Sequence, residues 1–270
     1  MLFICPKCKS SLEEDEGRAV CKMGHSYDKS KYGYYNLLLS NVGGVHGDNK
    51  LMVEARRGFL EGGFYSPLAE KLTELTLKYT KNKCTVLDAG CGEGYYTNTV
   101  YRALVERDED AKLIAFDISK EAVRYTKKRV PDVEACVASC YSMPISDGAA
   151  DTVINVFSPL APEETHRVLK AGGIFIVAVP DTEHLFGLKS VLYEIPYKNT
   201  VNEIAPEGFS EVERVRVRYT MTLDDPRDIQ NLFMMTPYAY RTGESGRERL
   251  KKAKELVTEA DFSLFIYKRL

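Results

Sequence analysis

The sequence lacks several features that would each point to a particular class of protein. It contains no run of about 18 apolar residues, so no segment is predicted to span a membrane. Its formal net charge is only -2, so no strong overall field would attract nucleic acid, and any RNA contact would need a local basic patch. The first apolar stretch, Met1 to Ile4, is too short for a signal peptide. We therefore expect a soluble, cytoplasmic protein with no membrane partner.

The cysteines are seven, an odd number that suits a reducing compartment, where thiols bind metals or lie in cores. Four residues follow the spacing C-x2-C-x12-C-x3-H: Cys5, Cys8, Cys21 and His25. Two chelating pairs of this kind predict one tetrahedral Cys3His zinc site. A redox Cys-x-x-Cys motif is the competing interpretation, but it leaves Cys21 and His25 without a role. The other four thiols are predicted to be small buried residues: Cys84, Cys91, Cys136 and Cys140.

Residues 1–37 contain no long periodic run, and a metal would supply the folding free energy that so short a segment lacks. They are predicted to form a zinc-ribbon-like module, whose basic residues could contact phosphates or simply be solvated. Residues 40–50 are rich in Gly and Asn, which predicts a flexible linker or a ligand-ordered loop. Two helices are expected between Leu51 and Tyr79, separated by Gly62-Gly63, so that 38–80 comprises a linker and helices.

Residues 81–270 show alternating strand and helix patterns, which are typical of an α/β protein with a Rossmann-like, doubly wound, mostly parallel sheet. Strands are expected at 84–88, 112–116, 133–137, 151–156 and 174–179. Helices are expected at 95–105, 120–129 and 162–169, with Gly172-Gly173 as the stop signal of the last one. The alternation then weakens, with helices near 184–193 and 226–234 and strands at 213–222 and 262–268. The last two strands are predicted to form an antiparallel edge.

The most informative run is Val86 to Gly94, in which a strand leads into an acid and three alternating glycines. It resembles motif I of class I methyltransferases. Glycines let the main chain approach a ligand closely, and ligands bind at the switch point of an open α/β sheet. The spacing G-x-G-x-G fits a pyrophosphate less well than the dinucleotide pattern G-x-G-x-x-G, and Asp88 favours a ligand with a cationic amino end. These features indicate S-adenosylmethionine, held by residues that include Asp88, Gly90, Gly92, Glu93 and Gly94.

A second acid, Asp117, ends the next predicted strand and is followed by Ile118. A carboxylate there can accept hydrogen bonds from both ribose hydroxyls of an adenosine. Asp117 and the adjacent Ile118 are therefore predicted to contact the cofactor. Nicotinamide enzymes place an acid similarly, and Asp117 could also serve as a helix N-cap. The glycine-rich turn and Asp117 occur in the expected order within one βαβ unit, which favours a methyltransferase over these two alternatives.

Further segments resemble the RlmA-type guanine-N1 methyltransferases of large-subunit (23S) ribosomal RNA. They are the Cys3His ribbon, Gly33 to Leu38, Ala55 to Leu60, Tyr65 to Leu68, Cys91 to Thr97, Val137-Ala-Ser and Met235-Thr-Pro. The resemblance covers nearly the whole chain. It implies that the substrate is a guanine in a hairpin of domain II of that RNA, that the zinc module helps to hold the hairpin, and that the protein can form a homodimer. It also implies cofactor contacts from Tyr65, Gly92, Glu93 and His184. Without this resemblance, Tyr65 would be interpreted as an amphipathic residue that covers a helix end, and His184 as a residue at the start of a helix.

The segment Asn155 to Leu160, where methyltransferases shape the acceptor pocket, is unlike the Asn-Pro-Pro-Tyr motif of enzymes that methylate exocyclic amines. No catalytic base is identified, although His184 or a group within 155–159 should assist. Arg56 and Arg57 could bind phosphates or the cofactor carboxylate, or could be surface charges. Two rival functions stay open, a small-molecule methyltransferase and a non-catalytic RNA-binding protein that retains the cofactor fold.

Overall fold

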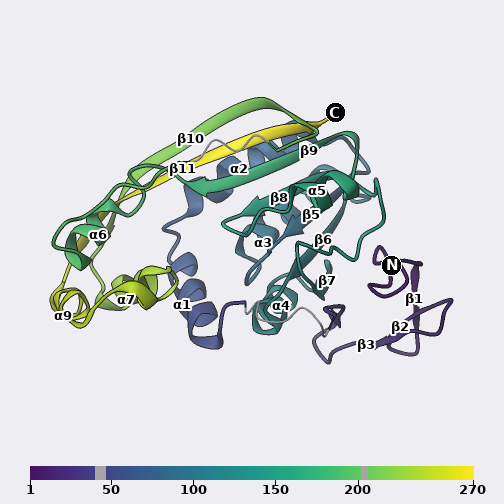
Figure 1. Ribbon diagram of the computed structural model, residues 1–270, viewed down its shortest axis with the longest axis horizontal. Helices are drawn as coiled ribbons and strands as arrows, with labels where there is room; N and C mark the ends of the chain where they lie inside the picture. The colour runs from purple at the N-terminus through teal and green to yellow at the C-terminus, as the bar shows by residue number, and fades with distance from the viewer. Residues whose placement is uncertain (40–46, 202–205) are drawn as a thin grey trace.

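Strand pairing organises most of the chain into one eight-stranded sheet with the order β10-β11-β9-β8-β5-β6-β7-β4 (Figure 1). The computed structural model describes residues 1–39, 47–201 and 206–270. The strands of this sheet are β4 (Tyr35–Asn36), β5 (Thr85–Ala89), β6 (Lys112–Asp117), β7 (Glu134–Val137), β8 (Ala150–Val156), β9 (Leu169–Pro180), β10 (Phe209–Leu223) and β11 (Leu256–Arg269).

The switch point of the sheet lies at β5. This strand pairs in parallel with β6 on one side and with β8 on the other, so the chain winds outward in both directions from it. Ligands of open α/β sheets bind at the carboxyl ends of the strands beside such a point. The turn that follows β5 is the predicted motif I, and the fold therefore places it where a ligand is expected.

The antiparallel part of the sheet differs in detail from the prediction. β11 pairs antiparallel with both β9 and β10, for example through Leu264, which lies opposite Ala178 and Val215. β11 is thus inserted between two strands that run in the same direction, and it alone runs against the others. The chain order of the last strands did not reveal this insertion, because either order satisfies an antiparallel pairing of β10 and β11.

The helices are α1 (Lys50–Glu61), α2 (Ser66–Tyr79), α3 (Tyr95–Arg107), α4 (Lys120–Arg129), α5 (Pro162–Val168), α6 (Phe186–Leu192), α7 (Pro226–Met234), α8 (Tyr238–Arg241) and α9 (Glu244–Lys252). The break at Gly62-Gly63 and the extents of α4 and α7 are confirmed. Helices α8 and α9 were not predicted. None of the helices in the described ranges is long and apolar enough to cross a bilayer.

The two faces of the sheet are covered differently. Val86 of β5 belongs to an apolar cluster that contains Leu72 of α2, whereas its neighbour Leu87 faces a second cluster that contains Phe3 and Val168. Strands that are buried on both faces are apolar at consecutive positions, which explains the unbroken Val-Leu pattern. The N-terminal segment therefore covers part of one face, together with the short helix α5.

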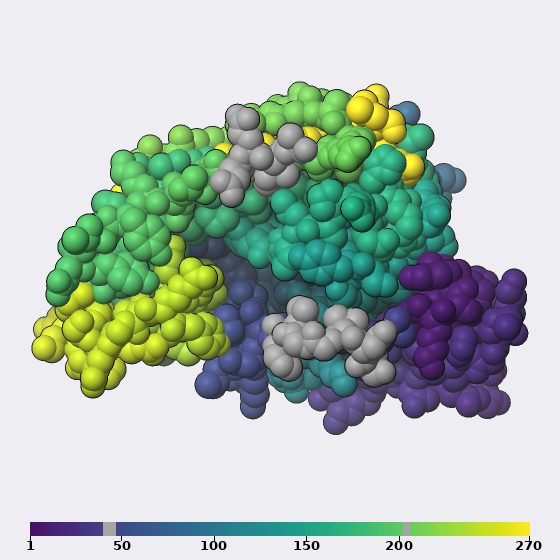
Figure 2. Space-filling view, viewed as in Figure 1, coloured from purple at the N-terminus to yellow at the C-terminus, as the bar shows by residue number. Residues whose placement is uncertain are grey.

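The N-terminal ribbon has its own three-stranded antiparallel sheet, made of β1 (Leu12–Asp15), β2 (Arg18–Cys21) and β3 (Ser26–Asp28). It is docked by backbone contacts: the amide of Ile4 donates to the Pro144 carbonyl at 2.9 Å, and Tyr35 of β4 pairs with Cys136 of β7. β4 lies within the predicted module 1–37 but forms the outer strand of the large sheet. The ribbon and helices α7 and α9 lie at opposite ends of the molecule (Figure 2).

One predicted helix end is wrong. Helix α5 ends at Val168, not at Gly172-Gly173, because β9 begins directly at Leu169 and pairs with Ala150 of β8. The glycine pair lies inside β9, next to a register shift between β8 and β9. There Gly173 passes so near other backbone that a Cβ would lie 2.8 Å from the Lys170 carbonyl oxygen, which explains the glycine without a helix end.

Two further predictions concern single segments. Of the predicted linker 40–50, residues 40–46 lie outside the described residues, and Asn49 caps α1 by accepting a hydrogen bond from the Met52 amide at 3.0 Å. The thiols of Cys84, Cys91 and Cys136 are buried as predicted, whereas Cys140 is only partly buried.

Candidate cofactor site and zinc cluster

The motif I turn, Gly90–Gly94, follows β5 and is fixed by the neighbouring strand. The amides of Gly90 and Cys91 both donate to the Phe116 carbonyl of β6 at 2.9 Å. Gly90 has a φ of 90° and faces Ser158, whose hydroxyl would overlap a Cβ at this position. Gly94 has a φ of 87°, and a Cβ there would lie 2.9 Å from Thr126 Cα. Both positions need glycine because the turn adopts left-handed backbone and packs against the β8 loop and α4.

Asp117 joins the two predicted cofactor motifs. Its Oδ2 accepts a hydrogen bond from the Gly92 amide at 3.0 Å, and its Oδ1 accepts one from the Ser119 amide at 2.8 Å. Ser119, not Asp117, is the N-cap of α4, because its hydroxyl accepts from the Ala122 amide. Ile118 lies beneath Gly47, whose Cβ would stand 2.7 Å from the isoleucine methyl carbon. The structure thus brings Asp117, Ile118 and the motif I turn together.

Asp88 is buried below the same turn, at 2% exposure, and accepts a hydrogen bond from the Thr97 hydroxyl at 2.6 Å. Burial raises the pKa of this carboxyl to about 7, although the Thr97 hydrogen bond opposes the shift. A cationic amino group nearby would favour the charged form. The chemistry of Asp88 therefore fits the methionine end of S-adenosylmethionine.

Glu93 is held by α4. Its Oε2 accepts hydrogen bonds from Arg129 at 2.6 and 3.1 Å, while its buried Oε1 has no partner within the described residues. An unpaired buried carboxylate oxygen can accept a hydrogen bond from a ligand. Glu93 is therefore positioned at the turn by Arg129 and retains one acceptor.

Tyr65 and His184 are distant in sequence but meet in the structure. The Tyr65 hydroxyl lies 3.3 Å from His184 Nε2, and His184 Nδ1 accepts from the Asp261 amide at 3.3 Å. Because Nδ1 accepts, the proton of the neutral ring is on Nε2, which donates to Tyr65. Burial lowers the pKa of His184 to about 3, so the ring is neutral at physiological pH. His184 therefore orients Tyr65, and neither of its nitrogens is available as a base.

The four predicted zinc ligands form one cluster. Their ligand atoms all lie within 4.8 Å of one another, with the Cys8 and Cys21 sulfurs 3.6 Å apart. Zinc–sulfur bonds of about 2.3 Å in a tetrahedron require sulfurs roughly 3.8 Å apart, so the cluster fits this ion. A hydrogen bond from Ser10 lowers the pKa of the Cys8 thiol to about 6, which favours the thiolate that a metal needs.

Comparison with known proteins joins the two sites. Residues 3–41 match the family description "RlmA, N-terminal", and residues 80–220 match "Methyltransferase domain". A Bacillus subtilis protein named "Putative 23S rRNA (guanine-N(1)-)-methyltransferase YxjB" is 33% identical, over 98% of this chain and 96% of its own. A Streptomyces fradiae protein named 23S rRNA (guanine(748)-N1)-methyltransferase is 32% identical, over 82% of this chain and 79% of its own. The chain belongs to the RlmA family of methyltransferases. Its cofactors are S-adenosylmethionine and zinc.

The segment of this RlmA-family enzyme that is expected to shape the acceptor pocket follows β8. Phe157 has a φ of 56° and is 41% exposed, and its ring lies 5.4 Å from that of Phe262 and 6.3 Å from that of Tyr96. Asn155 donates to the Pro159 carbonyl at 3.2 Å, and its buried Oδ1 has no partner in the described part of the chain. The segment thus presents an aromatic face and one free acceptor beside the motif I turn.

The two predicted arginines of α1 point to different places. Arg56 forms an ion pair with Asp48, and its Nη1 would be 3.9 Å from a Cβ at Gly92. Arg57 instead pairs with Glu61 at 2.9 Å. Of these two arginines, only Arg56 lies next to the motif I turn.

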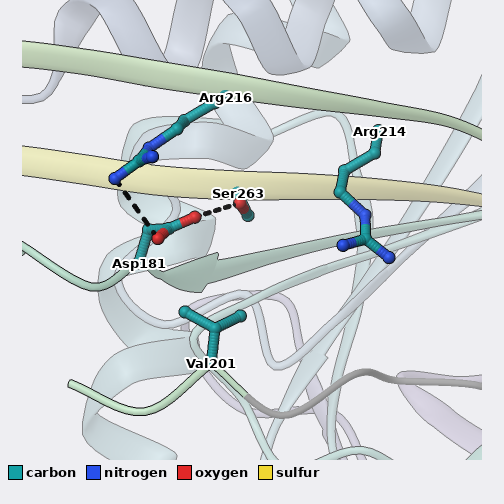
Figure 3. Close-up of a pocket in the computed structure, with 5 residues that line it drawn as sticks. All are labelled: Asp181, Val201, Arg214, Arg216 and Ser263. Atoms are coloured by element: carbon teal, nitrogen blue, oxygen red, sulfur yellow. Dashed lines mark hydrogen bonds and ion pairs between the residues drawn. The ribbon is translucent and has the colours of Figure 1, made fainter.

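A charged network that supports His184 was missed by sequence reasoning. Arg216 binds the fully buried Asp261 through two hydrogen bonds of 2.8 and 2.7 Å. Arg216 also lies 3.4 Å from Asp181, which accepts from the Ser263 hydroxyl (Figure 3). A cavity of about 400 Å³ is lined by Asp181, Arg216 and Ser263, together with Val201 and Arg214. The available signal was Asp261 itself, an acid that directly precedes the mostly apolar run Phe262 to Tyr267. Buried charges require partners, so this acid predicts a nearby cation.

Proposed function

We propose that the protein transfers a methyl group from S-adenosylmethionine to N1 of a guanine in a hairpin of large-subunit (23S) ribosomal RNA. The observation that carries the proposal is the combination of a motif I turn at the switch point and a zinc ribbon docked on the same sheet. A relative matched over 98% of this chain is named for this reaction. A cytoplasmic location and a homodimer are part of the proposal.

The division of labour follows the three parts of the chain. We assign RNA recognition to the zinc module 1–37, a connecting role to 38–80 and methyl transfer to 81–270. The metal ligands are Cys5, Cys8, Cys21 and His25. When bound there, zinc holds the turns after Cys5 and Cys21 together, and these turns already close through 2.8 Å backbone hydrogen bonds.

The cofactor residues act in three groups. Asp117 and Ile118 receive the adenosine end, with the Asp117 carboxylate accepting from ribose hydroxyls. Gly90, Gly92 and Gly94 provide close access to backbone, and Asp88 and Glu93 accept from the amino end. Tyr65, oriented by His184, closes the opposite side.

S-adenosylmethionine supplies, when bound, an already activated methyl group, so the protein mainly aligns the acceptor and excludes water. Guanine N1 lies on the Watson-Crick edge, so the base must leave its stack to reach the site. The exposed ring of Phe157 offers a surface for the extruded base, and Asn155 Oδ1 offers an acceptor for one of its N–H groups.

The test is transfer of labelled methyl from S-adenosylmethionine into an unmodified 23S transcript, followed by digestion and detection of 1-methylguanosine. Asp117→Ala serves as the control for cofactor dependence. We expect label in guanosine with the wild type and little with the variant. Label only in small metabolites would favour the small-molecule enzyme, and RNA binding without transfer would favour the non-catalytic protein. Sedimentation at micromolar concentration tests the dimer.

A further inference from the structure

Two tyrosines on the surface near the cofactor site are surrounded by cations. Arg124 lies 5.6 Å from the ring centre of Tyr32 and 4.8 Å from that of Tyr125, and Lys128 lies 5.5 Å from both. Lys31 adds a cation 5.3 Å from Tyr32, and Arg57 adds one 5.1 Å from Tyr125. We call this set the tyrosine–cation surface: Lys31, Tyr32, Arg57, Arg124, Tyr125 and Lys128.

The charges of this surface are only partly balanced. Arg124 pairs with Glu121 and Arg57 pairs with Glu61, but in the described ranges neither Lys31 nor Lys128 has an acidic partner. The hydrogen bond from Arg124, together with the nearby lysines, lowers the pKa of the Tyr32 hydroxyl, which agrees with a positive potential. Because the whole chain has a net charge of -2, four cations around two rings are a local concentration.

The tyrosine–cation surface extends from the end of the ribbon across α4 to α1. Tyr32 belongs to the end of the ribbon, Arg57 to α1, and Tyr125 to α4, which lies between them (Figure 1). The inner side of α4 holds the motif I turn, because the Thr126 hydroxyl donates to the Gly92 carbonyl at 2.9 Å. The tyrosine–cation surface is therefore next to the cofactor turn, on the outer side of the same helix.

Cation–π contacts could serve only to fasten the ribbon to α4. Arg124, which contacts both rings, fits that role. Lys31 and Lys128 do not fit that role, because both are exposed and each adds to the electrostatic repulsion among the neighbouring cations. An anion would remove this repulsion. Aromatic rings interleaved with cations are what proteins use to bind unpaired nucleotides, with rings stacking on bases and cations contacting phosphates.

We propose that the tyrosine–cation surface binds unpaired nucleotides of the substrate RNA beside the target guanine, with Tyr32 and Tyr125 stacking on bases and Lys31, Arg57 and Lys128 contacting phosphates. The inference rests on the proposed function and adds the place where the RNA contacts the protein.

The test compares Lys128→Glu and Tyr125→Leu with two matched controls. Lys254→Glu makes the same charge change at an exposed lysine just after α9, at the far end of the molecule, and Tyr125→Phe keeps the ring. Binding of a protein-free 23S transcript is measured between 50 and 200 mM KCl. Cofactor affinity and melting temperature are measured alongside.

We expect Lys128→Glu to weaken RNA binding about tenfold and to reduce the slope of log affinity against log salt by roughly 0.7 or more. Tyr125→Leu should also weaken binding about tenfold but leave the slope unchanged, because stacking releases no counterions. Both controls should bind as the wild type does, and cofactor affinity should not change.

Wild-type RNA affinity in both test variants would overturn the inference, while 1-methylguanosine formation would still uphold the proposed function. A lower melting temperature in Tyr125→Leu with unchanged RNA affinity would assign the tyrosines to fastening the ribbon and equally overturn it. Equal competition by polyglutamate would assign the surface to an acidic protein. Failure of methyl transfer alone would reject the proposed function, because RNA binding by the variants is scored separately.

Discussion

The hydroxyl of Tyr65 lies 3.3 Å from Nε2 of His184, and this pair is the point where the predicted cofactor contacts meet the charged network behind β11. From Tyr65 the contacts continue through His184 to the Asp261 amide, and the Asp261 carboxylate is held by Arg216. These residues come from four segments: Tyr65 from the turn before α2, His184 from the loop after β9, Asp261 from β11 and Arg216 from β10.

The pair leads to a prediction for Tyr65→Phe. This substitution keeps the ring but leaves the His184 N–H buried without an acceptor, which should cost about 1–3 kcal/mol of unfolding free energy and weaken S-adenosylmethionine binding. Denaturant unfolding and calorimetry measure the two effects. Tyr141→Phe removes a hydroxyl from a 60% exposed ring and should change neither. Equal effects of the two substitutions would contradict the assignment.

Asp88 predicts a pH dependence. Its pKa is about 7 in the folded protein against an ordinary value of 3.8, so between these values the folded state binds more protons than the unfolded state. The contribution of this group to stability is therefore fully present below about pH 4 and is lost as pH rises through 7, by roughly 4 kcal/mol. Asp88→Asn should remove this dependence. Parallel pH profiles for the free energy of unfolding of the two proteins would show that the carboxyl is not protonated in the fold.

Cofactor binding should depend on Asp88 in the opposite sense. A cationic amine favours the carboxylate, so wild-type affinity for S-adenosylmethionine should rise from pH 6 to 8 more steeply than that of Asp88→Asn. Calorimetry in two buffers of different ionisation enthalpy should detect release of a proton only in the wild type.

Gly90→Ala should abolish cofactor binding and destabilise the protein, because the new methyl group overlaps the Ser158 hydroxyl and the residue has a positive φ. Gly17→Ala measures the effect of a positive φ without a steric overlap, since Gly17 has a φ of 79° and a Cβ added there would meet no atom within 4 Å. We expect about 1 kcal/mol of lost stability for Gly17→Ala and several times more for Gly90→Ala. The double variant Gly90→Ala/Ser158→Gly should recover part of the difference. No recovery would show that the clash is not the cause.

Zinc should be present at about one ion per chain, and Cys8→Ala should lower this amount to near zero. Because the ribbon shares backbone pairing with β7, loss of the metal should also increase hydrogen exchange at the Leu37 amide, which donates to the Val137 carbonyl at 2.9 Å. Metal analysis and exchange mass spectrometry measure both. Full zinc content in Cys8→Ala would remove Cys8 from the ligand set.

Much of the fold and of the site could be predicted because both depend on short segments with local signals. The glycines after β5, the acid that ends β6 and the spaced thiols each act within a short segment, and the structure brings them together as their spacing suggested. The pairing of Tyr65 with His184 could be expected only through the family, since 119 positions separate them.

Other features depend on contacts between distant segments and left no local signal. The insertion of β11 between β9 and β10, the extension of the large sheet by Tyr35 and the ion pair of Arg216 with Asp261 are of this kind. The glycine pair at 172–173 was visible in the sequence but was interpreted as a helix end. A close approach of two backbone segments also requires glycine, so the sequence pattern alone does not distinguish the two cases.

The pairing of β4 with β7 closes one edge of the large sheet. Removal of the N-terminal ribbon would strip the outer strand, leave the β7 backbone as an open edge and uncover apolar side chains around Cys136. Open edges recruit strands from other molecules, so a shortened chain would self-associate instead of persisting as a smaller enzyme. The ribbon therefore protects an edge of the large sheet in addition to holding the zinc cluster.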